Sequence, residues 1–191
     1  MSQRSKRPAV FMDRDGTIIR QVELLSKVSQ VKLFPDAAAA IRKFNTLGYL
    51  VVIITNQPVI ARGIIGPKEV DHIHAVLIDR LAKKGAKIDA VYYCPHHPKA
   101  NVKKYRMECR CRKPNIGMIT DAAKKFNIDL KKSFFVGDST RDVLTGNRAK
   151  VKMILVATGH GGKDVWQFKS KPDFVVKNLA QAARIVGKYK K

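Results

Sequence analysis

The stretch Asp13-Arg14-Asp15-Gly16-Thr17 follows directly on the apolar run Ala9-Val10-Phe11-Met12. An apolar run before a Gly-containing turn predicts a short buried strand, which would hold two carboxylates at the carboxyl edge of a sheet. Open α/β folds bind their ligands at this edge, so paired carboxylates there suggest phosphate chemistry. The alternative is an acidic junction between strand and turn, because Asp-Gly pairs also occur in ordinary loops.

Short apolar runs alternate with longer amphipathic segments along the chain, which is typical of β-α units that build a mainly parallel sheet. We expect strands at residues 8–12, 50–54, 88–93, 133–136, 153–156 and 174–176, and helices at 36–47, 67–84, 117–126, 141–148 and 179–186. Two segments, 18–33 and 95–112, interrupt the alternation. We expect both to be loops beside the site, since loops at the carboxyl edge carry function in such folds.

Composition places the chain among single-domain proteins, so we expect one domain over residues 1–191, with basic and flexible termini. No apolar run is long enough to cross a bilayer, and the first residues lack a signal peptide, so we expect a cytoplasmic monomer. The net charge of +23 would attract phosphorylated metabolites or nucleic acid. A dedicated nucleic-acid module is not favoured, because the lysines are spread in pairs without aromatic residues between them.

Polar side chains also follow the second and fourth expected strands. Thr55, Asn56 and Gln57 come after the second strand, where they could donate to phosphate oxygens or simply mark a turn. Asp138 ends the fourth strand and Asp142 lies four residues later. A third carboxylate beside two others needs a cation, and Mg²⁺ prefers oxygen ligands, although Asp138 could instead cap a helix.

Lys113 ends the second irregular segment, and a lysine held there could neutralise phosphate charge. Alone it would be an ordinary surface lysine. In chain order, however, Asp-x-Asp, Thr55, Lys113 and Gly137-Asp138 resemble the four motifs of haloacid dehalogenase-like phosphatases, over residues 8–157. The resemblance implies a single Rossmann-like α/β domain with helices on both faces of a mainly parallel sheet and no large cap.

The same resemblance implies a role for each matching residue. Asp13 would attack phosphorus to form an aspartyl-phosphate, and Asp15 would protonate the leaving oxygen and then activate water. Thr55 and Lys113 would hold the phosphoryl oxygens. Mg²⁺ would lie between the Asp13 carboxylate, the Asp15 backbone carbonyl and Asp138, with Asp142 in a supporting role.

The three cysteines lie in one segment, 94–111, together with two histidines. Cys94, His96, Cys109 and Cys111 could chelate tetrahedral Zn²⁺, with His97 as an alternative to His96 and buried thiols as an alternative to a metal site. Four protein ligands leave no open position, so the zinc would be structural and would pin the loop that presents Arg112 and Lys113.

This loop is similar to that of D-glycero-D-manno-heptose 1,7-bisphosphate phosphatases, and histidinol-phosphate phosphatases share its pattern with a shorter loop. The resemblance implies removal of the 7-phosphate from a small phosphorylated sugar. The residues expected to bind that substrate are Gln21, Val22, Glu23, Leu24, Asn56, Gln57, Arg62 and Arg112. The chain departs from the family pattern at Pro58-Val59, at residues 19–25 and at Ser139, where many relatives carry a basic residue.

Two further functions fit the sequence. One is a phosphatase acting on nucleic-acid 3′ ends, since an open site and a basic surface would suit that substrate. The other is a zinc-bearing nucleic-acid-binding protein in which the acidic motif no longer works. Steep salt dependence of binding without phosphate release would distinguish the second.

Overall fold

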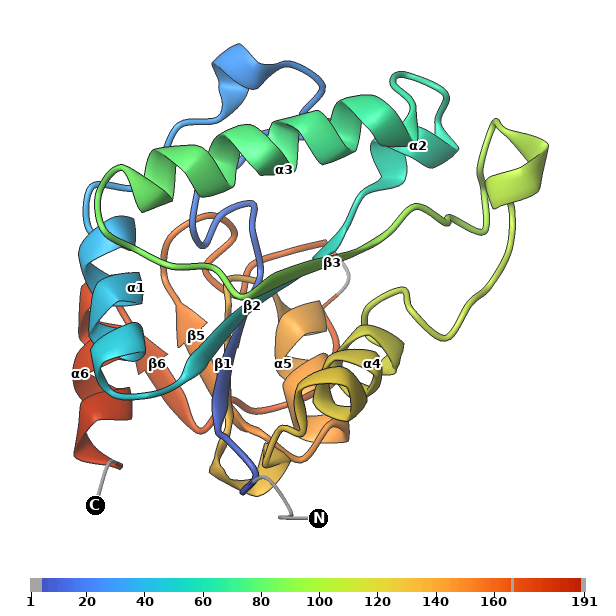
Figure 1. The fold of residues 1–191 in the computed structure, drawn as a ribbon. Helices are drawn as coiled ribbons and strands as arrows, with labels where there is room; N and C mark the ends of the chain where they lie inside the picture. The colour runs from blue at the N-terminus through green and yellow to red at the C-terminus, as the bar shows by residue number, and fades with distance from the viewer. Residues whose placement is uncertain (1–4, 166, 190–191) are drawn as a thin grey trace.

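A computed structural model describes residues 5–165 and 167–189, and the outermost residues of the basic termini lie outside this part. Its centre is one parallel sheet with the strand order β3-β2-β1-β4-β5-β6 (Figure 1). The strands are β1 (Ala9–Met12), β2 (Leu50–Asn56), β3 (Ala90–Cys94), β4 (Phe134–Gly137), β5 (Lys152–Val156) and β6 (Phe174–Val176). The expected parallel α/β architecture is confirmed.

Helices cover both faces of this sheet. The elements are α1 (Ala37–Thr46), α2 (Pro58–Ala61), α3 (Pro67–Ala82), α4 (Gly117–Phe126), α5 (Thr140–Arg148) and α6 (Leu179–Lys188), with short 3₁₀ helices η1 (Val28–Gln30), η2 (Lys103–Tyr105) and η3 (Leu130–Lys132). In Figure 1, α1, α3 and α6 lie on one side of the strands and α4 and α5 on the other. Of the helices in residues 5–165 and 167–189, none is long and apolar enough to cross a membrane.

Strand β1 belongs to both halves of the core because successive side chains of a strand point to opposite faces. Val10 and Met12 pack into the layer with α1, α3 and α6, whereas Ala9 and Phe11 pack into the layer with α4 and α5. All four residues are fully buried. Burying one large apolar side chain contributes about 1.5–3 kcal/mol, so β1 is a firmly held support for the aspartate that follows it.

The second strand is longer than the sequence predicted, because it runs to Asn56 rather than stopping at residue 54. Pairing with β3 continues through Thr55 and Asn56, which lie opposite Tyr93 and Cys94. Thr55 and Asn56 therefore extend from the sheet itself rather than from a loop. The short helix α2 was not expected, and its first residue is Pro58, whose fixed φ suits a first helical turn. The other boundaries differ from the expected ones by at most two residues.

Candidate active site

Three aspartates meet at the carboxyl edge of the sheet. Asp13 directly follows β1, and its backbone N–H donates to the carbonyl of Val136 in β4 at 2.9 Å. Asp138 directly follows β4, and Asp142 lies in the first turn of α5. One carboxylate oxygen from each of the three lies within 4.8 Å of the others. Adjacent parallel strands thus bring together carboxylates that are more than 120 residues apart in sequence.

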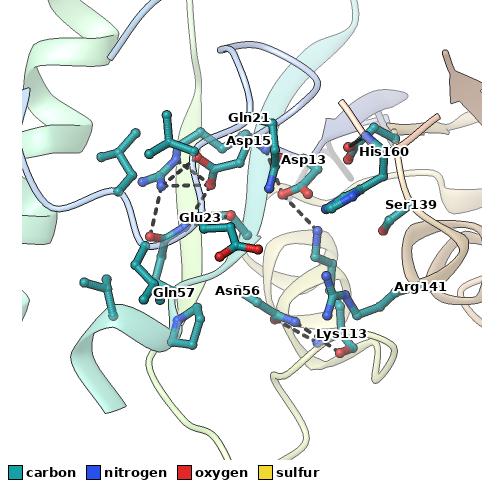
Figure 2. Close-up of a pocket in the computed structure, with 18 of the residues that line it drawn as sticks. Asp13, Asp15, Gln21, Glu23, Asn56, Gln57, Lys113, Ser139, Arg141 and His160 are labelled. Carbon is teal, nitrogen blue, oxygen red and sulfur yellow. Dashed lines mark hydrogen bonds and ion pairs between the residues drawn. The ribbon is translucent and has the colours of Figure 1, made fainter. Parts of the chain in front are cut away.

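Lys113 is the cation of this cluster. Its Nζ lies 2.9 Å from Asp13 Oδ1 and 2.6 Å from Asp142 Oδ1, and its side chain is 1% exposed (Figure 2). Burial alone would lower the pKa of Lys113, but the charges of Asp13 and Asp142 outweigh burial and raise that pKa. Lys113 therefore stays protonated and fixes the position of the Asp13 carboxylate.

Asp142 is fully occupied by protein groups. Its Oδ1 receives Lys113, and its Oδ2 accepts from Ser139 Oγ at 2.6 Å and from the Ser139 N–H at 3.2 Å. Burial would raise the pKa of Asp142, but Lys113 and then Arg141 outweigh it and lower that pKa. Asp142 thus holds Lys113 in place as an anion and starts helix α5 through a capping box.

Asp13 and Asp138 are the less stable anions of the cluster. Burial raises the pKa of Asp138 to about 8, and the charges of Asp142 and Asp13 add to this effect. The pKa of Asp13 is also raised, chiefly by burial, although Lys113 opposes the shift. Gly16 and Gly159 lie against the Asp138 carboxylate, where a Cβ on either would clash with it. The backbone therefore packs closely around the Asp138 carboxylate.

Asp15 belongs to a second buried network beside the first. Arg14, which is 1% exposed, donates to Asp15 Oδ2 at 2.8 Å and to Gln57 Oε1 at 3.0 Å. Its Nη1 lies 3.0 Å from His74 Nε2, and burial followed by the Arg14 charge lowers the pKa of His74 to about 3. His74 on α3 is therefore neutral and accepts from Arg14. Gln57 Nε2 donates to Thr55 Oγ1 at 3.0 Å, which ties the network to the end of β2.

A cavity of about 240 Å³ opens above both networks. Its lining includes every residue that the sequence predicted for catalysis or for substrate binding, namely Asp13, Asp15, Gln21, Val22, Glu23, Leu24, Thr55, Asn56, Gln57, Arg62, Arg112 and Lys113. The side-chain amide of Asn56 bonds the backbone N–H and carbonyl of Lys113 at 3.0 and 3.1 Å. Asn56 and Gln57 thus position catalytic candidates as well as facing the cavity.

The cysteine segment forms a cluster separate from the three aspartates. The sulfur atoms of Cys94, Cys109 and Cys111 lie 3.1–3.5 Å from one another, and His96 Nδ1 lies 3.5 Å from Cys111 Sγ and 3.8 Å from Cys94 Sγ. All three cysteines are free thiols. The structure brings His96 to the cluster rather than His97, whose Nδ1 accepts from the Lys99 N–H at 3.0 Å. The four donors match the composition of a closed tetrahedral site.

Similarity to known proteins is extensive. A HAD-hydrolase-like family model matches residues 110–182. The Rhodopseudomonas palustris protein named D-glycero-beta-D-manno-heptose-1,7-bisphosphate 7-phosphatase is 42% identical over 146 residues, which cover 76% of this chain and 81% of that protein. This chain belongs to the heptose-1,7-bisphosphate 7-phosphatase family of HAD-like hydrolases.

Other relatives extend over more of the chain. A Photorhabdus laumondii member of the family, named for the alpha anomer of the heptose, is 38% identical and covers 83% of this chain and 87% of its own. The crystal structure of the D,D-heptose 1,7-bisphosphate phosphatase from B. bronchiseptica, complexed with magnesium and phosphate, has a TM-score of 0.82 and 30% identity. It covers 95% of this chain and 98% of its own, so the family resemblance includes the whole sheet.

Seven residues of this family member line the cavity without having been predicted as site residues: Arg14, Leu25, Pro58, Val59, Ser139, Arg141 and His160. His160 lies in the loop after β5, and its backbone N–H donates to Asp138 Oδ2 at 2.7 Å. The sequence did hold a signal for His160, because the strand expected at 153–156 ends at the same edge of the sheet as Asp13 and Asp138. The Gly-rich segment after that strand, however, is also typical of an ordinary flexible loop. Ser139 and Arg141 lie between two predicted aspartates, where the start of α5 directs them to the site.

Proposed function

We propose that this protein is a Mg²⁺-dependent phosphatase that removes the 7-phosphate of D-glycero-D-manno-heptose 1,7-bisphosphate through an aspartyl-phosphate on Asp13. The observation that carries the proposal is the contact of buried Lys113 with both Asp13 and Asp142 at the floor of the cavity. This arrangement would present the Asp13 carboxylate and the fixed Lys113 cation to the same phosphoryl group. The names of the relatives support the substrate.

The donor set suits Mg²⁺. Asp138 offers a buried carboxylate and Asp13 a partly exposed one, and hard divalent cations prefer such oxygen ligands. We assign Mg²⁺ to these two side chains and the backbone carbonyl of Asp15, while Asp142 remains a supporting residue because protein groups occupy both of its oxygens. When bound, the ion would neutralise charge on the carboxylates and on the phosphoryl oxygens.

In the first step, an Asp13 oxygen attacks phosphorus and the bond from phosphorus to heptose O7 breaks. Asp15 gives its proton to O7, so the sugar leaves as an alcohol. Lys113 and the Thr55 hydroxyl hold the phosphoryl oxygens where charge spreads in the transition state. Arg14 and Gln57 orient the Asp15 carboxyl group before this transfer.

In the second step, water attacks the phosphorus of the aspartyl-phosphate. Asp15, now a carboxylate, takes a proton from that water, and the bond from phosphorus to the Asp13 oxygen breaks. Inorganic phosphate leaves and both aspartates return to their starting states. The two carboxylates thus have different tasks because Lys113 contacts one and Arg14 contacts the other.

The outer part of the cavity would bind the sugar. Residues 21–24 line the cavity, and Arg62 and Arg112 supply positive charge to it. The Glu23 carboxylate can accept from sugar hydroxyls. The cavity volume of about 240 Å³ suits a compact substrate that enters it in part.

We further propose that Cys94, His96, Cys109 and Cys111 bind a structural Zn²⁺. The close approach of four soft and borderline donors supports this assignment. Arg112 Nη1 donates to the carbonyl of His96 at 2.8 Å, so the metal cluster would position an arginine at the rim of the cavity. We also propose a cytoplasmic location, since free thiols suit a reducing compartment.

Phosphate release from a panel of substrates tests the function. The panel contains the alpha and beta anomers of the heptose bisphosphate, histidinol phosphate and a 3′-phosphorylated oligonucleotide, each with and without Mg²⁺. We expect Mg²⁺-dependent release that is fastest with a heptose bisphosphate and absent in Asp13→Asn. A higher kcat/KM for histidinol phosphate or the oligonucleotide would contradict the substrate. Equal rates for wild type and Asp13→Asn would contradict the mechanism.

A further inference from the structure

Besides Arg14, which is paired with Asp15, three arginines line the cavity: Arg62, Arg112 and Arg141. Among the residues described here, no acidic side chain forms an ion pair with any of them. Arg141 stands apart because its Nε is buried and has no hydrogen-bond partner within the described structure. A buried donor without a partner is costly, so a guanidinium in this state indicates a missing acceptor.

The position of Arg141 explains where that acceptor would lie. Arg141 is the second residue of α5, between the capping residue Ser139 and Asp142. Figure 2 shows its side chain extending from the Ser139 side of the cavity toward Lys113. Arg112 approaches from the cysteine loop, and its pKa is lowered first by burial and then by the charge of Arg141. The two guanidiniums are thus close enough for their charges to interact, and neither forms an ion pair with an acidic side chain of the described residues.

Asp142 does not supply this anion. Although Arg141 acts on Asp142 through its charge, no ion pair joins them, and the oxygens of Asp142 are taken by Lys113 and Ser139. The reacting phosphoryl group does not need Arg141 either, because Lys113 already contacts Asp13 from the floor of the cavity. The acceptor that remains for Arg141 is therefore a second anionic group, which would lie farther from Asp13 than the reacting phosphoryl group.

We propose that Arg141, together with Arg112, binds the phosphate that does not react, and that Arg141 thereby determines specificity for bisphosphorylated over monophosphorylated sugars. A planar guanidinium pair suits a phosphate because each can donate two parallel hydrogen bonds to its oxygens. The inference rests on the proposed function in one respect, namely that the scissile phosphate lies against Asp13.

The test compares Arg141→Gln with wild type on matched pairs of substrates. One pair is the heptose 1,7-bisphosphate and heptose 7-phosphate, and a second is fructose 1,6-bisphosphate and fructose 6-phosphate. We expect kcat/KM for the bisphosphate to fall about 10- to 100-fold, mainly through KM, while kcat/KM for the monophosphate changes less than about threefold. Arg141→Lys should recover part of the loss, because lysine restores the charge but not the two parallel hydrogen-bond donors of a guanidinium.

Arg184→Gln is the matched control, since it removes the same charge from α6, outside the cavity lining. An equal loss on both members of each pair, or a fall in thermal stability that accounts for the loss, would overturn the inference in favour of a structural role. A wild type without preference for either bisphosphate would also overturn it. If the wild type prefers the fructose bisphosphate and Arg141→Gln removes that preference, the proposed heptose substrate fails and the role of Arg141 stands.

Discussion

The aspartate cluster and the cysteine cluster both gather distant residues, but different forces hold them. Asp13 and Asp138 follow adjacent strands whose side chains are fully buried, so the sheet determines their separation. The cysteine cluster instead joins the end of β3 to a long segment in which η2 is the regular element between Cys94 and Cys111. Little apolar burial fixes the far side of that segment, where Met107 is 43% exposed.

This difference separates two ways of building a site. The catalytic cluster would keep its geometry without its metal, because hydrogen bonds and strand pairing already orient each carboxylate. The conformation of the cysteine loop depends on contacts between its own side chains rather than on strand pairing. A bound metal would therefore order the loop where the backbone hydrogen bonds do not. Disrupting each cluster should therefore produce a different kind of damage.

The largest effect should come from Lys113→Met. It leaves the buried Asp142 and the partly exposed Asp13 without their shared cation, so we expect the free energy of unfolding to fall by about 3–5 kcal/mol. Loss of the cation from the phosphoryl site should lower kcat by about 100- to 1,000-fold. Denaturant titration and steady-state kinetics measure the two effects.

Lys83→Met is the matched control, because the Lys83–Asp79 pair is exposed on both sides. Removing such a pair should change the free energy of unfolding by less than about 1 kcal/mol and leave kcat unchanged. Similar destabilisation by the two substitutions would mean that the buried cation does not organise the catalytic cluster.

The double substitution Cys109→Ser and Cys111→Ser should have a smaller and more local effect. We expect loss of bound zinc and faster hydrogen exchange in residues 95–112, with β1 amides still protected, because the sheet does not depend on the loop. Displacement of Arg112 and Lys113 should lower kcat/KM roughly 10- to 100-fold. Exchange mass spectrometry and metal analysis measure the outcome, and equal loss of protection in β1 would refute the local role.

The same contrast explains what the sequence could predict. Apolar runs ending in Asp13 and Asp138 indicated two strand ends, and the parallel topology placed them side by side. The cysteine spacing predicted a cluster but left His96 and His97 open, because adjacent residues of a loop have no fixed direction. The contact of the Lys99 N–H with His97 Nδ1 decides between them in the structure.

Contacts between distant helices and loops had no sequence signal. His74 reads as one of two histidines on a helix, and its contact with Arg14 depends on α3 packing over the end of β1. Nothing in the sequence distinguishes Arg141 from the other arginines of this basic chain. Its place in the cavity follows from the capping of α5 by Ser139, which directs the first turn toward the catalytic cluster.

The smallest effect concerns pH and the Arg14 network. The folded-state pKa of His74, about 3, lies below its ordinary value of 6.5, so the unfolded chain binds a proton first as pH falls. This residue therefore reduces stability below pH 6.5, by about 1 kcal/mol between pH 6.5 and 5.5. His74→Gln keeps an acceptor for Arg14 and cannot titrate, so its free energy of unfolding should depend less on pH by this amount. Parallel curves for wild type and variant would show that His74 is not buried as a neutral base.

Trapping the covalent intermediate tests the central claim most directly. Asp15→Asn cannot activate water, so brief reaction with p-nitrophenyl phosphate, whose leaving group needs no proton from Asp15, and Mg²⁺ followed by acid quenching should leave one phosphoryl group on the protein. Peptide mass spectrometry should place it on Asp13, and Asp13→Asn should carry none. Phosphoryl transfer to another residue, or turnover by wild type with no label on Asp13 in Asp15→Asn, would contradict the account.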